Sequence, residues 1–227
     1  MEGAFLLIPP DTVTPTPLED NAKLSASLAR SIKASKVPHV VLLSSVGAQH
    51  ETGTGPIRAL HRAELDFTAT GVALTAVRAS SFQENLGGSL GALGQGIFPT
   101  FIPKALAYPQ VASQDIGRTV AAALAEGGKP GKHVIELAGP REYSAADVAA
   151  ELAKITGKPV AATDAPLDAV VPMFTGFGMS AAMAGLYREM FEGVASGQVG
   201  FEGTPRRGST DVGTPLKTLL AGGGGGH

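Results

Sequence analysis

The chain has 227 residues, of which 44% are hydrophobic and 17% charged, with a formal net charge of −2. This balance is typical of a globular protein with one substantial core, and it indicates neither nucleic acid nor an acidic membrane surface as a partner. Cysteine is absent, which excludes disulfides, thiolate nucleophiles and Cys-ligated metal sites. No stretch reaches the ~18 apolar residues of a membrane span, and no basic signal region opens the chain, so we expect a cytoplasmic protein.

The N-terminal third alternates between strand and helix patterns. The apolar run Ala4–Ile8 predicts a short buried strand, which Pro9 and Pro10 end because proline donates no backbone hydrogen bond. Apolar residues recur at helical spacing over 18–36, which predicts an amphipathic helix. The continuous aliphatic run over 39–44 predicts a strand that is buried on both faces of a parallel sheet.

The same alternation continues along the chain. Further helices are predicted over 57–70 with Gly71 as the C-cap, over 113–126, and over 145–156 between the N-cap Ser144 and Gly157; further strands are predicted over 72–78 and 132–137. Strands that alternate with helices of about a dozen residues indicate right-handed crossovers and a parallel sheet with helices on both faces. We therefore predict an α/β, Rossmann-like fold.

The pattern changes after Gly139, where helix becomes predominant. We expect residues 1–139 to form a Rossmann-like domain and residues 140–221 to form a smaller, mostly helical lobe on the substrate side. Methionines and phenylalanines recur in this lobe from Met173 to Phe191, and packing is the favoured interpretation of them over a lining for the cleft. The glycine run that precedes His227 indicates a linker and tag remnant over 222–227.

Several segments together carry a resemblance to a known family. They are SSVGA at 44–48, ELDFTATGVALTAVRASSFQENL at 64–86, ASQDIGRTVAAALAEG at 112–127, GKHVIELAGPREYSAADVAAELAKITGKPV at 131–160 and GTPLKTLL at 213–220. In order and spacing they resemble the NmrA-like family of atypical short-chain dehydrogenases/reductases, which includes quinone oxidoreductases, azoreductase-like enzymes and NAD(P)-sensing regulators. The resemblance implies NADP or NAD as the cofactor and a small planar acceptor that is reduced by hydride transfer.

The family's pattern also implies a truncation. Residues 4–10 resemble the fourth strand of the family's sheet, so three strands and a G-x-x-G-x-x-G turn that holds the dinucleotide pyrophosphate are expected before them. We therefore expect an N-terminally truncated Rossmann-like domain with Ala4–Ile8 as a bare edge strand. Such an edge predicts a homo-oligomer through strand 4–8, coverage by another segment, or poor solubility.

The resemblance implies that the cofactor contacts follow two strand ends, at Pro9, Ser44, Ser45 and Val46. The carboxyl ends of strands are where open α/β sheets bind their ligands. For Ser44, a hydroxyl that caps a helix or a turn is an equally favoured interpretation.

The substrate side is implied to include Phe82, Gln83 and Asn85, because an aromatic wall and an amide can stack a quinone-like ring and hydrogen-bond its carbonyl. The alternative is that Phe82 belongs to the core and Asn85 caps a turn. His61 is a candidate acid/base group because imidazole titrates near neutral pH, although its position beside two arginines favours a solvated helix face.

The sequence was also searched for motifs of proton relay, phosphate binding and metal binding. The Tyr-x-x-x-Lys pair with which short-chain dehydrogenases protonate a carbonyl is absent. Gly88, Gly91 and Gly94 have the spacing of a phosphate-binding turn, but no strand leads directly into them, so a loop or a loosely helical stretch is favoured. No metal-ligand spacing occurs, and we predict no structural metal. Two functions stay open: an NAD(P)H-dependent reductase, and a non-catalytic regulator or truncated interaction module.

Overall fold

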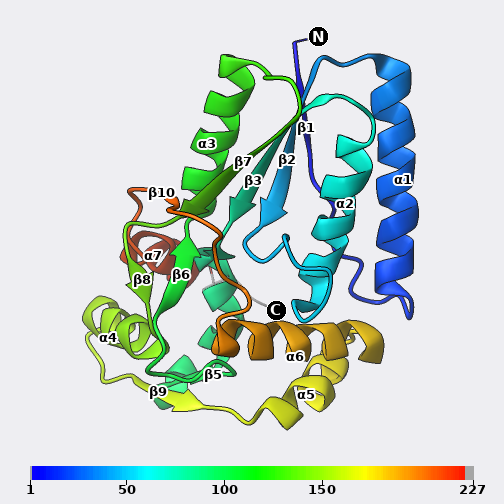
Figure 1. Ribbon diagram of the computed structural model, residues 1–227. Coiled ribbons are helices and arrows are strands. Elements are labelled where there is room, and N and C mark those ends of the chain that lie inside the picture. The colour runs from blue at the N-terminus through cyan, green and yellow to red at the C-terminus, as the bar shows by residue number, and fades with distance from the viewer. Residues whose placement is uncertain (1, 223–227) are drawn as a thin grey trace.

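The computed structural model describes residues 2–222, and its centre is a parallel five-stranded sheet with the strand order β1-β2-β3-β7-β10 (Figure 1). The strands are β1 (Ala4–Leu6), β2 (His39–Ser45), β3 (Ala73–Ala79), β7 (Lys132–Ala138) and β10 (Arg206–Arg207). Every neighbouring pair in this sheet is parallel. The predicted α/β, Rossmann-like class is thus confirmed.

Helices cover both faces of the sheet, as Figure 1 shows. They are α1 (Pro17–Ser35) and α2 (Arg58–Thr68) on one face and α3 (Ser113–Glu126) on the other. Val40 and Leu42 of β2 pack in one cluster with Ile32 of α1 and Phe67 of α2. The intervening Val41 packs with residues of α3. Because both faces are buried, β2 shows a continuous apolar run in place of an alternating pattern.

The lower part of Figure 1 contains smaller elements that lie beyond the carboxyl ends of the main strands. One small sheet joins β4 (Ser81–Phe82), β6 (Tyr108–Val111) and β8 (Glu142–Tyr143), and β5 (Ile97–Thr100) pairs with β9 (Ala161–Asp164). The helices are α4 (Ala145–Thr156), α5 (Val170–Gly176), α6 (Ala181–Ser196) and α7 (Gly213–Gly222), with 3₁₀ helices η1 (Gly55–Ile57), η2 (Gln83–Gln95) and η3 (Leu167–Ala169). An apolar cluster that includes Phe98, Tyr143, Leu152 and Leu216 holds β5, β8, β9, α4, α7 and η2 together.

The predicted division at Gly139 stays a prediction, although strands connect the two sides of it. β5 precedes Gly139 and pairs with β9, whereas β10 comes from the C-terminal part and joins the main sheet beside β7. The strands β8, β9 and β10 were not predicted, because strands of two to four residues are too short to show alternation. Of the predicted linker 222–227, Gly222 ends α7 and the remainder lies outside the described residues.

The longer elements lie close to their predicted bounds. Helix α3 spans the predicted 113–126, and α4 spans 145–156, where Ser144 and Asp147 form a reciprocal capping box. Helix α2 ends at Thr68 and not at the predicted Thr70, so Gly71 is not its cap. Strand β1 pairs over only three residues and is shorter than predicted. Within residues 2–222, no helix is long and apolar enough to cross a membrane.

Candidate functional site

The carboxyl ends of β2 and β3 lie near a loop, residues 46–57, that packs against α6 (Figure 1). Gly55 in this loop has a φ of +60°, and a Cβ there would overlap the backbone of α6 at Leu186, so this position requires glycine. A Cβ at Gly193 of α6 would likewise overlap the Gly53 carbonyl oxygen, at 2.6 Å. The loop and α6 therefore form one cover over the edge at which parallel sheets bind ligands.

A buried carboxylate lies beneath this cover. Glu64 of α2 is 1% exposed and accepts hydrogen bonds from the Ser44 hydroxyl at 2.6 Å, from Arg78 Nε and Nη2 at 2.9 and 2.8 Å, and from Lys132 Nζ at 3.0 Å. These four residues come from α2, β2, β3 and β7, and we call them the Glu64 cluster. The bidentate geometry and the low exposure of Arg78 make this a fully paired buried ion pair.

The charge state of the Glu64 cluster follows from these contacts. Burial by itself raises the pKa of Glu64, but the hydrogen bonds from Arg78, Ser44 and Lys132 outweigh it and hold the pKa below its ordinary 4.5. Burial likewise opposes the charge of Arg78, and Glu64 and Glu202 raise its pKa above the ordinary value. Both partners are therefore ionised at neutral pH.

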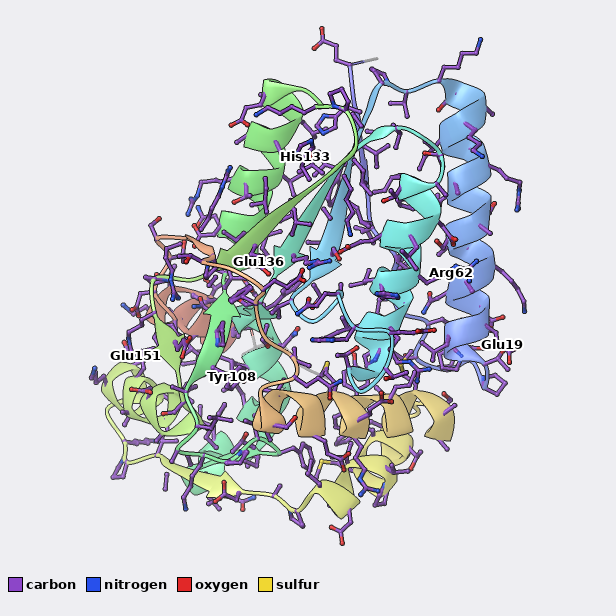
Figure 2. All side chains as sticks on the ribbon, viewed as in Figure 1. Glu19, Arg62, Tyr108, His133, Glu136 and Glu151 are labelled. Carbon is purple, nitrogen blue, oxygen red and sulfur yellow. The ribbon has the colours of Figure 1, made fainter. Side chains whose placement is uncertain are left out.

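The Glu64 cluster also holds the segment between α6 and β10. Arg78 Nη1 donates to the Glu202 carboxylate, and Gln49 of the loop donates to the Gly200 carbonyl at 2.8 Å. The carboxylate of Glu136, labelled on β7 in Figure 2, accepts the backbone N–H groups of Glu202 and Gly203 at 2.8 and 2.9 Å. Segment 199–204 is thereby tied to β3 and β7.

The four predicted cofactor residues lie in different environments. Ser44 is 2% exposed and its hydroxyl is bonded to Glu64, whereas Ser45 is half-buried and donates to the Val46 carbonyl at 3.0 Å. Val46 is buried, and Pro9 is exposed after β1. Ser45 and Pro9 are thus accessible at the strand ends, and cofactor contact by all four residues stays a prediction.

The predicted substrate residues after β3 are not brought to one surface. Phe82 is half-buried and packs against the core cluster on the α3 face. Gln83 is fully buried, and neither its oxygen nor its nitrogen has a hydrogen-bond partner among the described residues. Asn85 is exposed in η2. Their role in substrate binding stays a prediction.

His61 is half-buried on α2, and its Nδ1 lies 2.8 Å from the Ala48 carbonyl oxygen. Because a carbonyl only accepts, Nδ1 carries the proton and Nε2 is the acceptor nitrogen when the ring is neutral. His61 was interpreted as part of a solvated helix face. Its ring instead donates a hydrogen bond to Ala48 and so links α2 to loop 46–57.

A second set of buried polar side chains lies near the end of β3, and several of its polar atoms lack hydrogen-bond partners among the described residues. Ser80 Oγ, Gln110 Oε1 and both polar side-chain atoms of Gln83 are buried without a hydrogen-bond partner within residues 2–222. A Cβ on the adjacent Gly139 would overlap the Gln110 carbonyl oxygen and lie 3.4 Å from Gln83 Nε2. We call Ser80, Gln83 and Gln110 the Gln83 cluster.

Neither cluster was found from the sequence. Arg78 did carry a signal, because an arginine inside an apolar strand run requires a buried partner. The sequence spacing does not identify Glu64 as that partner, since the contact depends on how α2 packs over β2 and β3. The sequence carries no signal that Gln83 and Gln110 are buried together, because glutamine side chains are mostly exposed.

A dinucleotide fits only part of this structure. Gly88, Gly91 and Gly94 lie in the 3₁₀ helix η2, which confirms the loosely helical interpretation and excludes a strand-turn-helix phosphate cradle there. Loop 46–57 leads from β2 into α2 and holds Gly47, Gly53 and Gly55, but these glycines do not have the G-x-x-G-x-x-G spacing. The described residues therefore contain no turn of the kind that holds a dinucleotide pyrophosphate.

Two shallow hollows lie on the surface that the described residues form. A shallow hollow of about 370 Å³ lies beside β7 and includes Glu136, Glu202 and Arg206, and another of about 240 Å³ lies at the opposite end of β2 and β3. Over the described part of the chain, no group of three or more His, Asp or Glu side chains is placed to hold a metal ion.

No protein-family model matches the chain, but one curated protein and several solved structures are similar to it. The chain is 27% identical to an NAD(P)H azoreductase of Xenophilus azovorans over 182 residues, which cover 78% of this chain and 62% of the azoreductase. The chain thus spans less than two thirds of that relative.

Two solved structures show the same fold over nearly the whole chain. An NADPH-dependent quinone oxidoreductase from Escherichia coli, complexed with NADPH, matches 96% of this chain and 76% of its own, with a TM-score of 0.77 and 21% identity. A triphenylmethane reductase from Citrobacter sp. matches 97% of this chain and 76% of its own, with a TM-score of 0.79 and 13% identity. The resemblance to the NmrA-like quinone oxidoreductases and related reductases is therefore confirmed, and the chain shares their fold.

Proposed function

We propose that the chain forms the acceptor-binding side of an NAD(P)H-dependent reductase for small planar acceptors such as quinones or dyes. The observation that carries the proposal is the common edge where β2 and β3 end beneath loop 46–57 and α6, in a fold shared with such reductases. The similarity to the azoreductase supports the same reaction class from sequence.

At this edge we expect the residues of the chain to orient the acceptor and not to transfer a proton to it. When bound, NAD(P)H would supply the hydride, and the hydroquinone anion formed from a quinone would take one proton from solvent. Phe82 offers a half-buried aromatic face for a planar ring, and Ser45 offers an accessible hydroxyl for a carbonyl. His61 keeps its Nε2 as an acceptor, because Nδ1 is bonded to Ala48. Positioning of this kind lowers the barrier without a Tyr-x-x-x-Lys relay.

The test is a titration with NADPH followed by nicotinamide fluorescence, together with NADPH consumption in the presence of a benzoquinone. We expect saturable binding and turnover, and we expect Phe82→Ala to raise KM more than it lowers kcat. The matched control is Phe177→Ala, which removes a ring that is 83% exposed on the C-terminal part. If NADPH gives neither consumption nor a thermal shift, this function is wrong for the chain.

The second candidate is a non-catalytic NAD(P)-sensing regulator or an interaction module. One observation favours it: the Ser44 hydroxyl is engaged by Glu64. Saturable NADPH binding without turnover of any quinone or dye would support the regulator, and absence of both would support the interaction module.

A further inference from the structure

Segment 199–204, which leads from α6 to β10, has little apolar support (Figure 1). It forms neither helix nor strand, and none of its residues belongs to the three apolar clusters of the described residues. The hollow of about 370 Å³ lies beside it, lined by residues 202–204 together with β7. A segment that polar contacts hold over a hollow can open at a low cost in free energy.

One side chain of this segment, Glu202, is bound to the Glu64 cluster. Arg78 Nε and Nη2 both donate to Glu64, whereas Nη1 donates to the Glu202 carboxylate and, at 3.4 Å, to the Gln49 amide oxygen. The Arg78 side chain is 3% exposed, and that of Glu202 is 61% exposed. The buried guanidinium therefore keeps one nitrogen for a carboxylate that reaches solvent.

The charges of the Glu64 cluster explain why a carboxylate is bound at this nitrogen. Glu64 carries one negative charge, and Arg78 and Lys132 carry one positive charge each, so the three side chains together have a net charge of +1. The Glu202 carboxylate brings the sum to zero. Without it a buried positive charge would be uncompensated, which is costly unless another anion takes its place.

We propose that Arg78 Nη1 is an anion-binding site that Glu202 occupies in this structure, and that a ligand carboxylate, sulfonate or phosphate displaces Glu202 and opens segment 199–204. The Glu202 carboxylate stands in for the anionic group of the ligand. A guanidinium suits such groups because its planar N–H donors match the geometry of their oxygens. The hollow provides the approach, and along it the charges of Glu136 and Arg206 offset each other.

Such an anionic group has two sources. A free anion would act as an effector, because its binding would release segment 199–204 from β3. An aromatic acceptor that carries an anionic substituent would instead be selected as a substrate, since the Glu64 cluster lies beneath the cover of the strand-end edge. The second source rests on the proposed function, and the first does not.

The first test is a titration of the full chain with inorganic sulfate at constant ionic strength, followed by NMR chemical shifts. Glu202→Gln removes the competing carboxylate, so we expect it to tighten sulfate binding about tenfold. Glu192→Gln is the matched control, because Glu192 is 50% exposed in a pair with Arg188 on α6 and should leave the affinity unchanged. Lys132→Gln, added to Glu202→Gln, returns the cluster to a net charge of zero and should cancel the gain. Circular dichroism verifies that each variant is folded.

The second test is hydrogen exchange of the backbone N–H groups of Glu202 and Gly203, which donate to Glu136. Sulfate should speed their exchange because it opens the segment, and chloride at the same ionic strength should not. The proposal is overturned if Glu202→Gln leaves sulfate binding unchanged or undetectable, if Glu192→Gln gives an equal gain, or if sulfate binds while both amides stay protected.

Turnover distinguishes the two sources. For an acceptor as the source, kcat/KM should be higher for a naphthoquinone sulfonate than for the unsubstituted naphthoquinone, and Glu202→Gln should raise it for the sulfonate alone. A sulfate response without this preference assigns the site to a free anion. Absence of turnover with any quinone would contradict the proposed function and not the anion site, which the sulfate titration tests by itself.

Discussion

Two polar groups lie near the end of β3, and the fold treats them differently. On the α2 face, the Glu64 cluster pairs a buried carboxylate with a hydroxyl, a guanidinium and an ammonium. Near Gly139, the Gln83 cluster buries two amides and a hydroxyl with several polar atoms unpaired among the described residues. The carboxylate of Glu64 and the three side chains of the Gln83 cluster are all buried, but only the Glu64 cluster satisfies its hydrogen-bonding groups.

The difference shows which buried polar groups stabilise the fold. A buried charge is tolerated only when it is fully paired, and removal of one partner leaves the other uncompensated. A buried amide without partners carries a desolvation penalty instead, so its removal relieves the fold. Substitution of a buried polar side chain is therefore expected to lower the stability of the fold in the Glu64 cluster and to raise it where the side chain is unpaired, as for Gln83.

The largest effect is expected in the Glu64 cluster. Glu64→Gln removes the charge that pairs with Arg78 and should lower the free energy of unfolding by about 3 kcal/mol or more. The measurement is urea denaturation followed by circular dichroism. Arg62→Gln is the control, because Arg62 lies on the same helix in an exposed pair with Asp66 and should change stability by less than about 1 kcal/mol. Equal losses in both variants would contradict a stabilising role for the buried pair.

The next effect concerns the packing around the Gln83 cluster. Gly139→Ala places a Cβ against the Gln110 carbonyl oxygen, a backbone atom that cannot move aside without shifting β6, and should cost about 2 kcal/mol. Gly88→Ala is the control, because nothing lies within 4 Å of its Cβ position. A neutral Gly139→Ala would show that the backbones of β6 and β7 are less closely packed than the structure describes.

Within the Gln83 cluster, two similar substitutions should have opposite signs. Gln83→Met replaces an unpaired amide with an apolar side chain of similar shape and should raise the free energy of unfolding by about 1 kcal/mol. Gln110→Met removes the bond from Nε2 to the Tyr143 carbonyl at 3.0 Å and should lower the free energy of unfolding by about 1 kcal/mol. A loss in both variants would mean that Gln83 has partners in solution.

Sequence patterns predicted the longer strands and helices better than they predicted the Glu64 and Gln83 clusters. The continuous apolar runs at 39–44 and 72–78 and the capped helix after Ser144 indicated the parallel sheet and one of its helices, because local periodicity and caps determine these elements. The pairing of β5 with β9 and the return of β10 to the sheet depend on long-range contacts that leave no local pattern.

For the candidate site, the sequence indicated the location and not the contacts. Ser44 was placed at the end of a buried strand, as the structure shows, but its hydroxyl donates to Glu64, which lies twenty residues further along the chain. Gln83 was expected to face an acceptor, and the structure buries it completely. Side-chain direction after a strand end depends on the following turn, which the residue types alone do not determine.

The smallest effect is a pH dependence that separates the Glu64 cluster from a further unsatisfied group, His39. Burial lowers the pKa of His39 below its ordinary 6.5; its Nε2 lies 3.0 Å from Thr75 Oγ1 and its Nδ1 has no partner among the described residues. The unfolded state therefore binds a proton more readily, so stability is full above pH 6.5 and falls as the pH drops below it, by at most about 1.4 kcal/mol per pH unit. The pKa of Glu64 is also lowered. The contribution of its ion pairs to the free energy of unfolding is therefore fully present above pH 4.5 and is lost only as the pH falls below that value. His39→Gln should remove the fall of the urea midpoint that begins as the pH drops below 6.5, and it should leave the fall below pH 4.5 unchanged. An unaltered slope just below pH 6.5 would show that His39 is not the titrating group.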